Sequence, residues 1–287
     1  MNVFYSKDLS KLIELFEAAE FGKIISQGDS VALKIHFGEP GNQAYLKPER
    51  VRALTRKVRD LGGLPFWTDA NTLYRGQRGD DQAHLQTAHN HGYTMNRTGA
   101  DVVISSGIPD AKAMIVITHF KGHELTGFGG ALKNVGMGCA TRAEKLDQHS
   151  ACDNCKAKPS CKKKEKVEAC WVGSSAVVQK KIVAHAAKAI RSFNKKTAFI
   201  NFITDVSENC DCYPHNSTPI VPDLGVLASS DPVALDQACV DMVNNADGRI
   251  NGRDKFKTLW PEVDWQVQLD EAEKLGLGSR KYELISL

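Results

Sequence analysis

Short apolar runs that alternate with amphipathic helical segments restrict the fold of this 287-residue chain more than any other feature. The runs are rich in valine, isoleucine and phenylalanine, and turn-forming or polar residues bound them, as is typical of β-strands. Between them, apolar side chains recur three and four residues apart, which is the period of a helix face. The runs that we predict to be strands are Val3–Tyr5, Val31–Phe37, Leu64–Thr68, Asp101–Ser106, Ala113–Phe120, Thr197–Ile203, Leu224–Ala228 and Tyr282–Ile285.

Helical segments follow most of these strands. Strands that alternate with helices favour parallel βαβ units, in which helices cover both faces of the sheet. We therefore expect an α/β fold with a mostly parallel sheet, formed as a single domain by residues 1–138 and 173–287. The predicted helices are one from residue 9 to about Gly22, then 48–61, 82–91, Ser174–Phe193 and Asp231–Val243, with two more amphipathic stretches in the C-terminal tail.

Residues 139–172 are expected to form a small cysteine-rich insertion in this domain. Cys152, Cys155, Cys161 and Cys170 follow the pattern Cys-x2-Cys-x5-Cys-x8-Cys. Two intervening residues let neighbouring thiolates reach one metal or cluster, and longer loops can bring further ligands to it. Large apolar side chains are almost absent here, so the segment cannot fold by burying a core. The spacing leaves three alternatives: an iron–sulfur cluster, a structural zinc ion and unliganded thiols.

Charge and composition limit the class of protein. The 37 basic and 34 acidic residues give a net charge of +3, which is too balanced to indicate nucleic-acid binding. Six lysines lie among the four cysteines, as a solvated face or as a docking surface for an acidic redox partner protein. No apolar run approaches 18 residues, and the N-terminus carries charges where a signal peptide is apolar. We therefore expect a cytoplasmic protein without a membrane span, whose eight cysteines are ligands or buried thiols.

Polar residues gather at the ends of the second and third predicted strands. Lys34 and His36 lie in an apolar strand, and lysine is rarely buried unless it is paired. Asp69, Asn71 and Arg75 follow the next strand, where turn capping is the simpler interpretation and substrate recognition the functional one. Open α/β sheets bind ligands at the carboxyl ends of their strands. These residues are therefore candidates for binding a small anion.

The glycine-rich stretch Thr126–Gly138 is a second candidate for anion binding, because the free backbone N–H groups at a helix start bind anions. A tight packing turn is the alternative. The stretch is neither a Walker loop nor a dinucleotide fingerprint. Its candidate ligand-binding residues are Gly127, Gly129 and Gly130, and Lys121, His123 and Lys133 flank them with two cations and a titratable imidazole.

Cys210, Cys212 and His215 form a third group, with the spacing Cys-x-Cys-x2-His. These ligand types suit a soft metal, but three ligands from one loop leave its shell incomplete. The alternatives are a buried thiol with a capping histidine, or a wall of the cluster site. The sequence contains no Gly-x-Ser-x-Gly elbow and no His-Glu-x-x-His helix, so it does not indicate a serine hydrolase or a zincin.

Five blocks in order carry a family resemblance: Lys34–Gly41, Thr68–Gly76, Lys121–Asn134, Cys210–His215 and Ser230–Asp236. From about residue 3 to residue 245 the chain resembles the uncharacterised iron–sulfur-centre proteins of the domain of unknown function 362 family. Members often carry a ferredoxin-like insertion after the Gly-Met-Gly-Cys-Ala block, with short Cys-x2-Cys-x2-Cys-x3-Cys-Pro runs. This chain has one atypical, shortened set, with gaps of five and eight residues and Trp171 in place of proline.

The resemblance implies one [4Fe–4S] cluster on the four cysteines, and the departures from the family's spacing keep zinc as the alternative. We therefore expect an iron–sulfur protein active in redox chemistry or electron transfer, as an oxidoreductase or as an electron carrier, with a small anionic ligand at the strand ends. His123 is the candidate for proton transfer, with Lys121 and His36 beside it. The alternative is a non-redox metal- or small-ligand-binding protein with a structural zinc knuckle.

Overall fold

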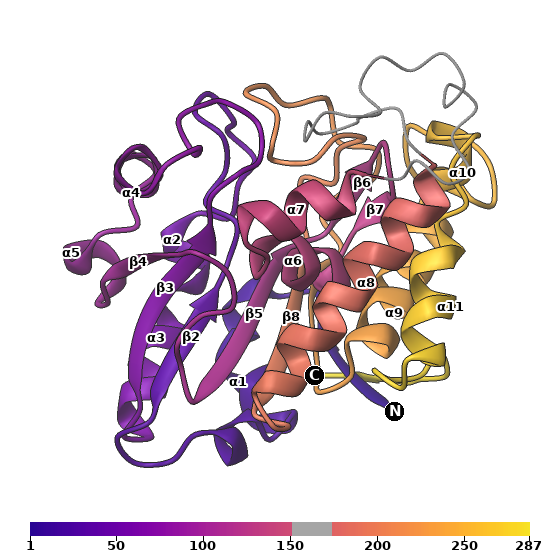
Figure 1. The fold of residues 1–287 in the computed structure, drawn as a ribbon. Helices are drawn as coiled ribbons and strands as arrows, with labels where there is room; N and C mark the ends of the chain where they lie inside the picture. Colours follow the sequence, from indigo (N-terminus) through magenta and orange to yellow (C-terminus); the bar gives the residue numbers. More distant parts are fainter. Residues whose placement is uncertain (151–173) are drawn as a thin grey trace.

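The structure is a computed structural model and describes residues 1–150 and 174–287. Eight strands form one sheet in the order β10-β1-β9-β8-β5-β2-β3-β4, and all neighbouring pairs are parallel except those of β9 with β1 and β8 (Figure 1). The predicted α/β fold with a mostly parallel sheet is confirmed. The strands are β1 (Asn2–Ser6), β2 (Ser30–Lys34), β3 (Leu64–Ala70), β4 (Val102–Ser105), β5 (Ala113–His119), β8 (Thr197–Ile203), β9 (Gly225–Ser229) and β10 (Glu283–Ser286).

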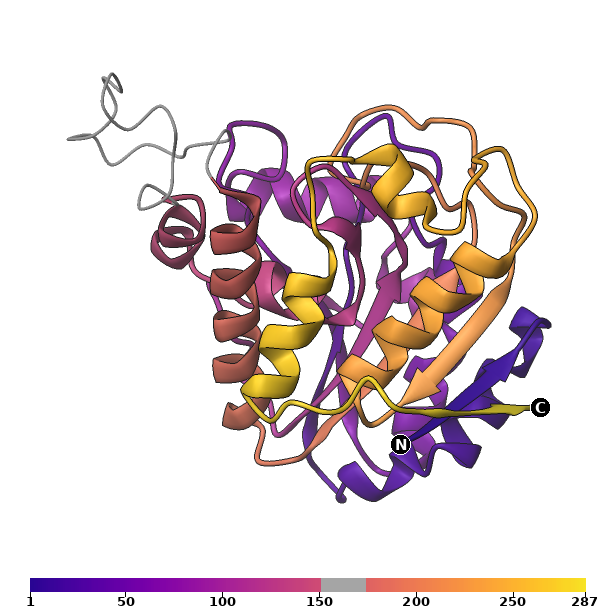
Figure 2. The same cartoon turned by 90° about the vertical axis from the view of Figure 1, so that its right-hand side faces the viewer.

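Helices cover both faces of the sheet. The long helices α8, α11 and α9 lie side by side over one face, as Figure 2 shows, with α6 packed against α8 and α9. The shorter helices α1 and α3 pack against the opposite face. Along the chain the helices are α1 (Leu12–Ala18), α2 (Pro48–Val51), α3 (Ala53–Asp60), α4 (Asp81–Asn90), α5 (Met95–Thr98), α6 (Ala131–Gly138), α7 (Arg142–Gln148), α8 (Ser175–Ser192), α9 (Pro232–Asn245), α10 (Lys255–Leu259) and α11 (Gln266–Lys274), with 3-10 turns at Leu9–Lys11 and Phe21–Ile24.

The sequence of the central strand β5 is continuously apolar because both faces of this strand are buried. Met114 and Val116 lie in the core beneath α6, α8 and α9, whereas Ile115 and Ile117 lie in the core beneath α1 and α3. Successive side chains of a strand point to opposite faces, so a strand covered on both faces needs apolar residues at every position. Two hydrophobic cores therefore share one sheet and fix the position of its carboxyl edge.

Two local features differ from the predicted elements. Strand β2 ends at Lys34, so the chain leaves the sheet before His36 instead of continuing to Phe37. The glycine-rich stretch forms a small antiparallel hairpin, β6 (Lys121–His123) with β7 (Gly127–Gly129), directly before α6. Both changes place polar side chains over the carboxyl edge of the sheet.

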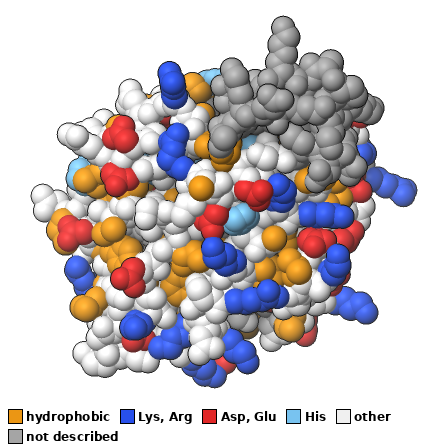
Figure 3. All heavy atoms as spheres, viewed as in Figure 1, with side chains coloured by type: hydrophobic (Ala, Val, Ile, Leu, Met, Phe, Trp, Pro, Cys, Tyr) orange, Lys and Arg blue, Asp and Glu red, His pale blue; other side chains and the backbone are white. Residues whose placement is uncertain are grey.

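Lysines and arginines are interspersed with acidic side chains over the face of the molecule shown in Figure 3. Among the residues that the structure describes, no helix is both long enough and apolar enough to cross a membrane.

Candidate functional site

A cavity of about 420 Å³ opens over the carboxyl ends of β2, β3 and β5. These strands are parallel neighbours, so the segments that follow them meet at one edge of the sheet. One wall is apolar and comes largely from α6 and α8, where Met137, Val178 and Ile182 face the space. Ala70, Leu73, Leu125 and Gly138 also line the space. Its charged or polar lining residues are His36, Asp69, Thr72, Tyr74, Arg78, His123, Glu124, Lys133, Asn134, Lys145, His149, Cys210, Cys212 and Tyr213.

A buried ion pair between Lys34 and Asp69 supports the base of the cavity. The Lys34 ammonium lies 3.0 Å from Asp69 Oδ1 and donates a hydrogen bond of 2.6 Å to Asn134 Oδ1. Burial opposes ionisation of Asp69, but Lys34, together with nearby histidines and Arg78, holds the pKa of its carboxyl well below its usual range. Lys34 is fully buried and does not line the cavity, so it positions Asp69.

Gly138 is necessary for this ion pair. A Cβ atom at Gly138 would lie 2.3 Å from the Lys34 ammonium nitrogen and 3.0 Å from Asp69 Oδ1. Any side chain there would displace the two charged groups from each other. The last residue of α6 is thus a glycine because the helix end packs directly on a salt bridge.

Arg78 lies in the cavity wall, and Arg75 does not. Arg78 is 1% exposed and donates to Glu39 Oε2 over 2.9 Å and to the Tyr74 hydroxyl over 2.5 Å. Its Nη1 atom also lies 2.9 Å from His36 Nε2. Burial disfavours the charge, but Tyr74 and the neighbouring anions raise the pKa of Arg78 above its usual value. Arg75, the arginine that the sequence suggested, is exposed and outside the cavity lining.

Asn71 also lies outside the cavity. Its side-chain N–H donates to Asp81, and its side-chain oxygen Oδ1 lies 3.1 Å from His84 Nδ1. The structure therefore brings together Asp69, His36, His123 and Lys133 of the predicted site, and holds the Asn71 side chain beside it through the side chains of Asp81 and His84.

Lys121 is engaged in a buried cluster behind the cavity. Its ammonium contacts the Asp211 carboxylate, which also lies 2.9 Å from His119 Nδ1. The second nitrogen of His119 is 2.5 Å from the Thr204 carbonyl oxygen. Burial opposes ionisation, yet Lys121 and His119 hold the pKa of Asp211 well below its usual range. Lys121 therefore fixes the loop that contains Asp211 and does not line the large cavity.

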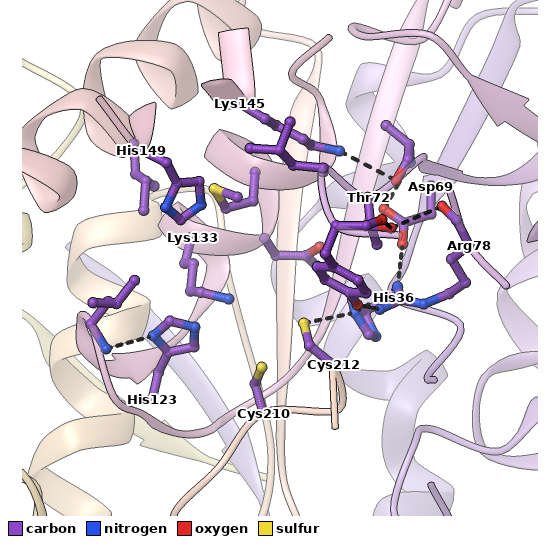
Figure 4. A pocket seen from close by; sticks show the side chains of 18 of the residues that line it. His36, Asp69, Thr72, Arg78, His123, Lys133, Lys145, His149, Cys210 and Cys212 are labelled. Atoms are coloured by element: carbon purple, nitrogen blue, oxygen red, sulfur yellow. Dashed lines mark hydrogen bonds and ion pairs between the residues drawn. The ribbon is translucent and has the colours of Figure 1, made fainter. Parts of the chain in front are cut away.

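Two thiols beside Asp211 face the cavity. Cys212 Sγ lies 3.5 Å from His36 Nε2, and the Cys210 side chain lies beside that of Cys212 in the cavity wall (Figure 4). The neighbouring Cys210 thiol, together with His36 and Lys133, lowers the pKa of Cys212 well below its usual value, although burial opposes this shift. The neighbouring Cys212 and burial raise the pKa of Cys210. Of the two cysteines, Cys212 therefore has the lower pKa.

His215 does not join these cysteines. It is exposed, and its ring packs 5.6 Å from the ring of Tyr213. In the described ranges, 1–150 and 174–287, no three histidine, cysteine or acidic side chains are grouped as a metal site would require. The predicted ligands Cys152, Cys155, Cys161 and Cys170 lie outside the described residues.

Lys133 carries a charge into the cavity from α6. Figure 4 shows its side chain pointing toward the space beside Cys210 and Cys212. No hydrogen bond or ion pair joins its ammonium to any residue of the described chain. Burial opposes its charge, but the two cysteines and Glu124 raise the pKa of Lys133.

His123 faces the same space as a neutral imidazole. Its Nδ1 accepts a hydrogen bond of 3.1 Å from the Leu125 N–H, so the ring proton belongs on Nε2. Burial and the charge of Lys133 lower the pKa of His123 well below its usual value. At neutral pH the ring is therefore a hydrogen-bond donor through Nε2.

Lys145 and His149 are cavity residues that the sequence reasoning did not select. Both lie in the stretch assigned to the insertion, on or just after α7, a helix with a capping box that packs against α8. Lys145 is buried and donates to the carbonyl oxygens of Ala70 and Asn71. Burial lowers the pKa of Lys145 to about 8, and burial together with Lys133 lowers that of His149 to about 4.

The glycine-rich stretch binds an anion, and that anion is a side chain of the protein. The backbone N–H groups of Ala131 and Leu132 donate to Asp236 over 2.7 and 3.0 Å. Asn201 donates to the same carboxylate over 2.8 Å. The first N–H groups of α6 are therefore occupied, and the expected anion site at this helix start is filled from α9.

Comparisons with known proteins give structural matches and a family match. No curated protein matches the sequence. The lactate racemase apoprotein from Thermoanaerobacterium thermosaccharolyticum aligns with a TM-score of 0.48 and 14% identity, covering 87% of this chain and 59% of that one. This chain thus spans about three fifths of that protein's length. The family model for the domain of unknown function DUF362 matches residues 31–106 and 96–241, and the chain therefore belongs to the DUF362 family.

Proposed function

We propose that the cavity is the reaction site of an oxidoreductase that binds a small organic anion. The observation that carries this proposal is Lys133, a cation directed into an enclosed space without a carboxylate partner among the described residues. A charge in a partly apolar cavity is costly unless it is paired. An anionic ligand would complete this interaction.

The cavity has the size and the mixed lining of a small-molecule site. Ligand cavities are commonly about 300–1,000 Å³, mostly apolar, with a few convergent polar groups. Here the apolar wall from α6 and α8 fits a hydrocarbon or aromatic body, and Lys133 with Lys145 fits a carboxylate, sulfonate or phosphate head. The preferred ligand is therefore an amphipathic anion.

The contacts of the other residues at the cavity indicate the role of each in binding or in proton transfer. The Nε2–H of His123 is placed to donate a hydrogen bond to a bound ligand. His36 accepts a bond of 3.1 Å from the Gly38 N–H at Nδ1, and its Nε2 lies 2.9 Å from Arg78 Nη1 and 3.5 Å from Cys212 Sγ, so the ring lies between the arginine and the thiol. Lys121 supports the loop of Asp211 and takes no direct part. Proton transfer is thus assigned to the Lys145 amine, whose pKa of about 8 lies near neutral pH.

For the redox part we propose that Cys152, Cys155, Cys161 and Cys170 hold one [4Fe–4S] cluster. A set of four thiols is the usual donor set for this cluster. When bound, such a cluster supplies one-electron transfer with a redox partner protein. His149 and Val178 lie just before and after the undescribed range, and both line the cavity, so the chain leaves and re-enters the described fold beside the ligand site.

A non-redox ligand-binding protein with structural zinc is the second candidate. The gaps of five and eight residues between the later cysteines favour it, because they are longer than the ferredoxin-type spacing. Tetrahedral zinc tolerates a wider range of ligand spacings. This candidate shares the anion-binding cavity and differs in the metal.

Metal analysis of protein purified without oxygen separates the two candidates. The oxidoreductase predicts four irons and four sulfides per chain and a visible absorption band that reductant bleaches. Cys155→Ser should remove that band while far-ultraviolet circular dichroism still reports a folded α/β domain. A colourless protein with one zinc and no iron would overturn the redox proposal.

The anion site has its own test, in which the probe is 8-anilinonaphthalene-1-sulfonate, an aromatic sulfonate that fluoresces in apolar sites. Lys133→Met keeps the length of the side chain but removes its charge, and should weaken binding about tenfold, the value of one charge-assisted hydrogen bond. Lys180→Met is the matched control, because Lys180 lies exposed on α8. Equal affinity of both variants would contradict the proposed anion site.

A further inference from the structure

Cys210 and Cys212 are presented to the cavity by a loop that is held on both sides. The carbonyl oxygen of Asp211, between the two cysteines, accepts a bond of 2.8 Å from the Glu39 N–H. Its side chain is buried against Lys121 and His119 on the side away from the large cavity. The middle residue is therefore anchored, while both flanking thiols line the large cavity.

The backbone geometry lets the two sulfurs bond to each other. The Tyr213 N–H donates to the Cys210 carbonyl over 3.2 Å and closes a tight turn across both cysteines. Residues two apart span at most about 7 Å even in an extended chain. Disulfides join Cα atoms about 4.4–6.8 Å apart, a range that a turn at this position reaches. Both side chains line the same cavity.

The surroundings of Cys212 are those of a nucleophilic thiolate. Cys212 Sγ lies 3.5 Å from His36 Nε2, and the Arg78 guanidinium, whose Nη1 lies 2.9 Å from that nitrogen, brings a positive charge to the same side of the cavity. Lys133 supplies a positive charge from the opposite wall. Cationic and hydrogen-bond-donating neighbours stabilise a thiolate, and an adjacent thiol is the arrangement that resolves a mixed disulfide. Cys139 and Cys239 are buried in the core and do not line the cavity.

We propose that Cys210 and Cys212 are a redox-active dithiol that reduces a small organic disulfide carrying an anionic group. The inference rests on the anion-binding cavity of the proposed function, and it does not depend on which metal the other four cysteines bind.

The chemistry proceeds by two thiol–disulfide exchanges. The Cys212 thiolate attacks one sulfur of the substrate, the substrate S–S bond breaks, and the first substrate thiolate leaves. Cys210 then loses its proton and attacks Cys212, which releases the second substrate thiolate and forms the Cys210–Cys212 disulfide. The substrate gains two electrons, and the dithiol loses them. The Cys210 proton passes to solvent or to a released substrate thiolate, and two electrons and one proton, from an external dithiol or from an iron–sulfur donor in two single steps, restore the thiolate–thiol pair.

The cavity also indicates which disulfides fit. The anionic group would meet Lys133, and an apolar body would lie on the wall of Met137, Val178 and Ile182. A suitable probe is 5,5′-dithiobis(2-nitrobenzoate), an aromatic disulfide with one carboxylate on each ring. Cystamine, a cationic disulfide, is the mismatched probe.

The experiment uses the full chain with its metal, purified without oxygen, reduced and freed of reductant. With one equivalent of the aromatic disulfide, tandem mass spectrometry should find an intramolecular Cys210–Cys212 disulfide, while Cys139 and Cys239 remain thiols. Cys210→Ser should stop at a mixed disulfide on Cys212. Cys212→Ser should slow modification of this loop at least tenfold. Cystamine should react at least tenfold more slowly than the aromatic disulfide after each rate is divided by the rate of the same disulfide with free glutathione, because the aromatic thiolate is intrinsically the better leaving group.

Failure of this inference is distinguishable from failure of the proposed function. If the wild-type protein forms no Cys210–Cys212 disulfide, or forms it equally fast with cystamine once both rates are divided by those with free glutathione, the dithiol inference is wrong, whatever the variants do. Anilinonaphthalene sulfonate binding that still depends on Lys133 in the same sample would leave the anion site intact. Loss of that dependence would instead contradict the proposed function.

Discussion

Gly130 and Asp236 touch in a way that only a glycine permits. A Cβ atom on Gly130 would lie 2.3 Å from Asp236 Oδ1, the oxygen that accepts the Ala131 N–H and thereby caps α6. Asp236 lies in α9, so one carboxylate joins the start of α6 to α9 and, through Asn201, to β8. The helix that supplies Lys133 to the cavity is positioned by this contact.

Gly130→Ala should therefore destabilise the protein by about 2–4 kcal/mol, because overpacking and loss of a helix cap act together. Urea unfolding measures the change. Gly22→Ala is the control, since its nearest neighbour, Leu61, would lie at an ordinary contact distance of 3.5 Å. That variant should stay within about 1 kcal/mol of the wild type. Equal effects of the two substitutions would show that the Asp236 contact does not hold α6.

Asp69→Asn removes the anion that neutralises Lys34 and Arg78 at the base of the cavity. Breaking a buried ion pair leaves an uncompensated charge, so we expect a loss of about 3–5 kcal/mol in the free energy of unfolding. Glu17→Gln is the matched control, because Glu17 pairs with Lys57 at 2.6 Å but is 58% exposed. Exposed pairs contribute about 1 kcal/mol or less. A small effect at Asp69 would contradict its assigned role.

Substitution of Lys121 tests whether this residue has a structural role or a catalytic one. Lys121→Met leaves the Asp211 carboxylate buried beside His119 without its cation, and should lower the free energy of unfolding by about 3–5 kcal/mol. Below its melting transition the folded variant should bind anilinonaphthalene sulfonate within about threefold of wild type, because Lys121 does not line the large cavity. Unchanged stability together with lost ligand binding would show that Lys121 belongs to the ligand-binding site.

The position of the cavity was predictable from the sequence because strand periodicity is a local property. Parallel strands place their carboxyl ends at one edge, so polar residues such as His36 and Asp69 after successive strands meet there. The hairpin of β6 and β7 was not predictable in the same way. Its strands have three residues each, and their glycines carry no periodic signal.

Contacts between distant segments limited the prediction of individual site residues. Arg75 and Arg78 lie in one polar segment, and chain order does not say which of them folds inward against Glu39. Asp236 occupies the helix start at Ala131 from 105 residues away, so the glycine-rich stretch looked open for a ligand. Lys145 was assigned to the cysteine-rich insertion, although the helix before those cysteines packs on α8.

Lys145 gives the cavity a pH dependence whose sign follows from its pKa of about 8, which burial lowers from the usual value. Below that pH its ammonium attracts an anion, and above it the neutral amine does not. Lys133 has a raised pKa and stays charged throughout. Binding of anilinonaphthalene sulfonate, whose sulfonate does not titrate, should therefore weaken about tenfold between about pH 6.5 and 9.5.

Lys145→Met should abolish this dependence and give, at every pH, the weak affinity that the wild type shows at high pH. Lys180→Met, on the exposed face of α8, should retain the wild-type profile. Fluorescence titrations at matched ionic strength measure both, because screening alters any charge-dependent affinity. If the Lys145 variant still lost affinity as the pH rose through about 8, another group would control the charge of the cavity. That result would also contradict the assignment of proton transfer to Lys145.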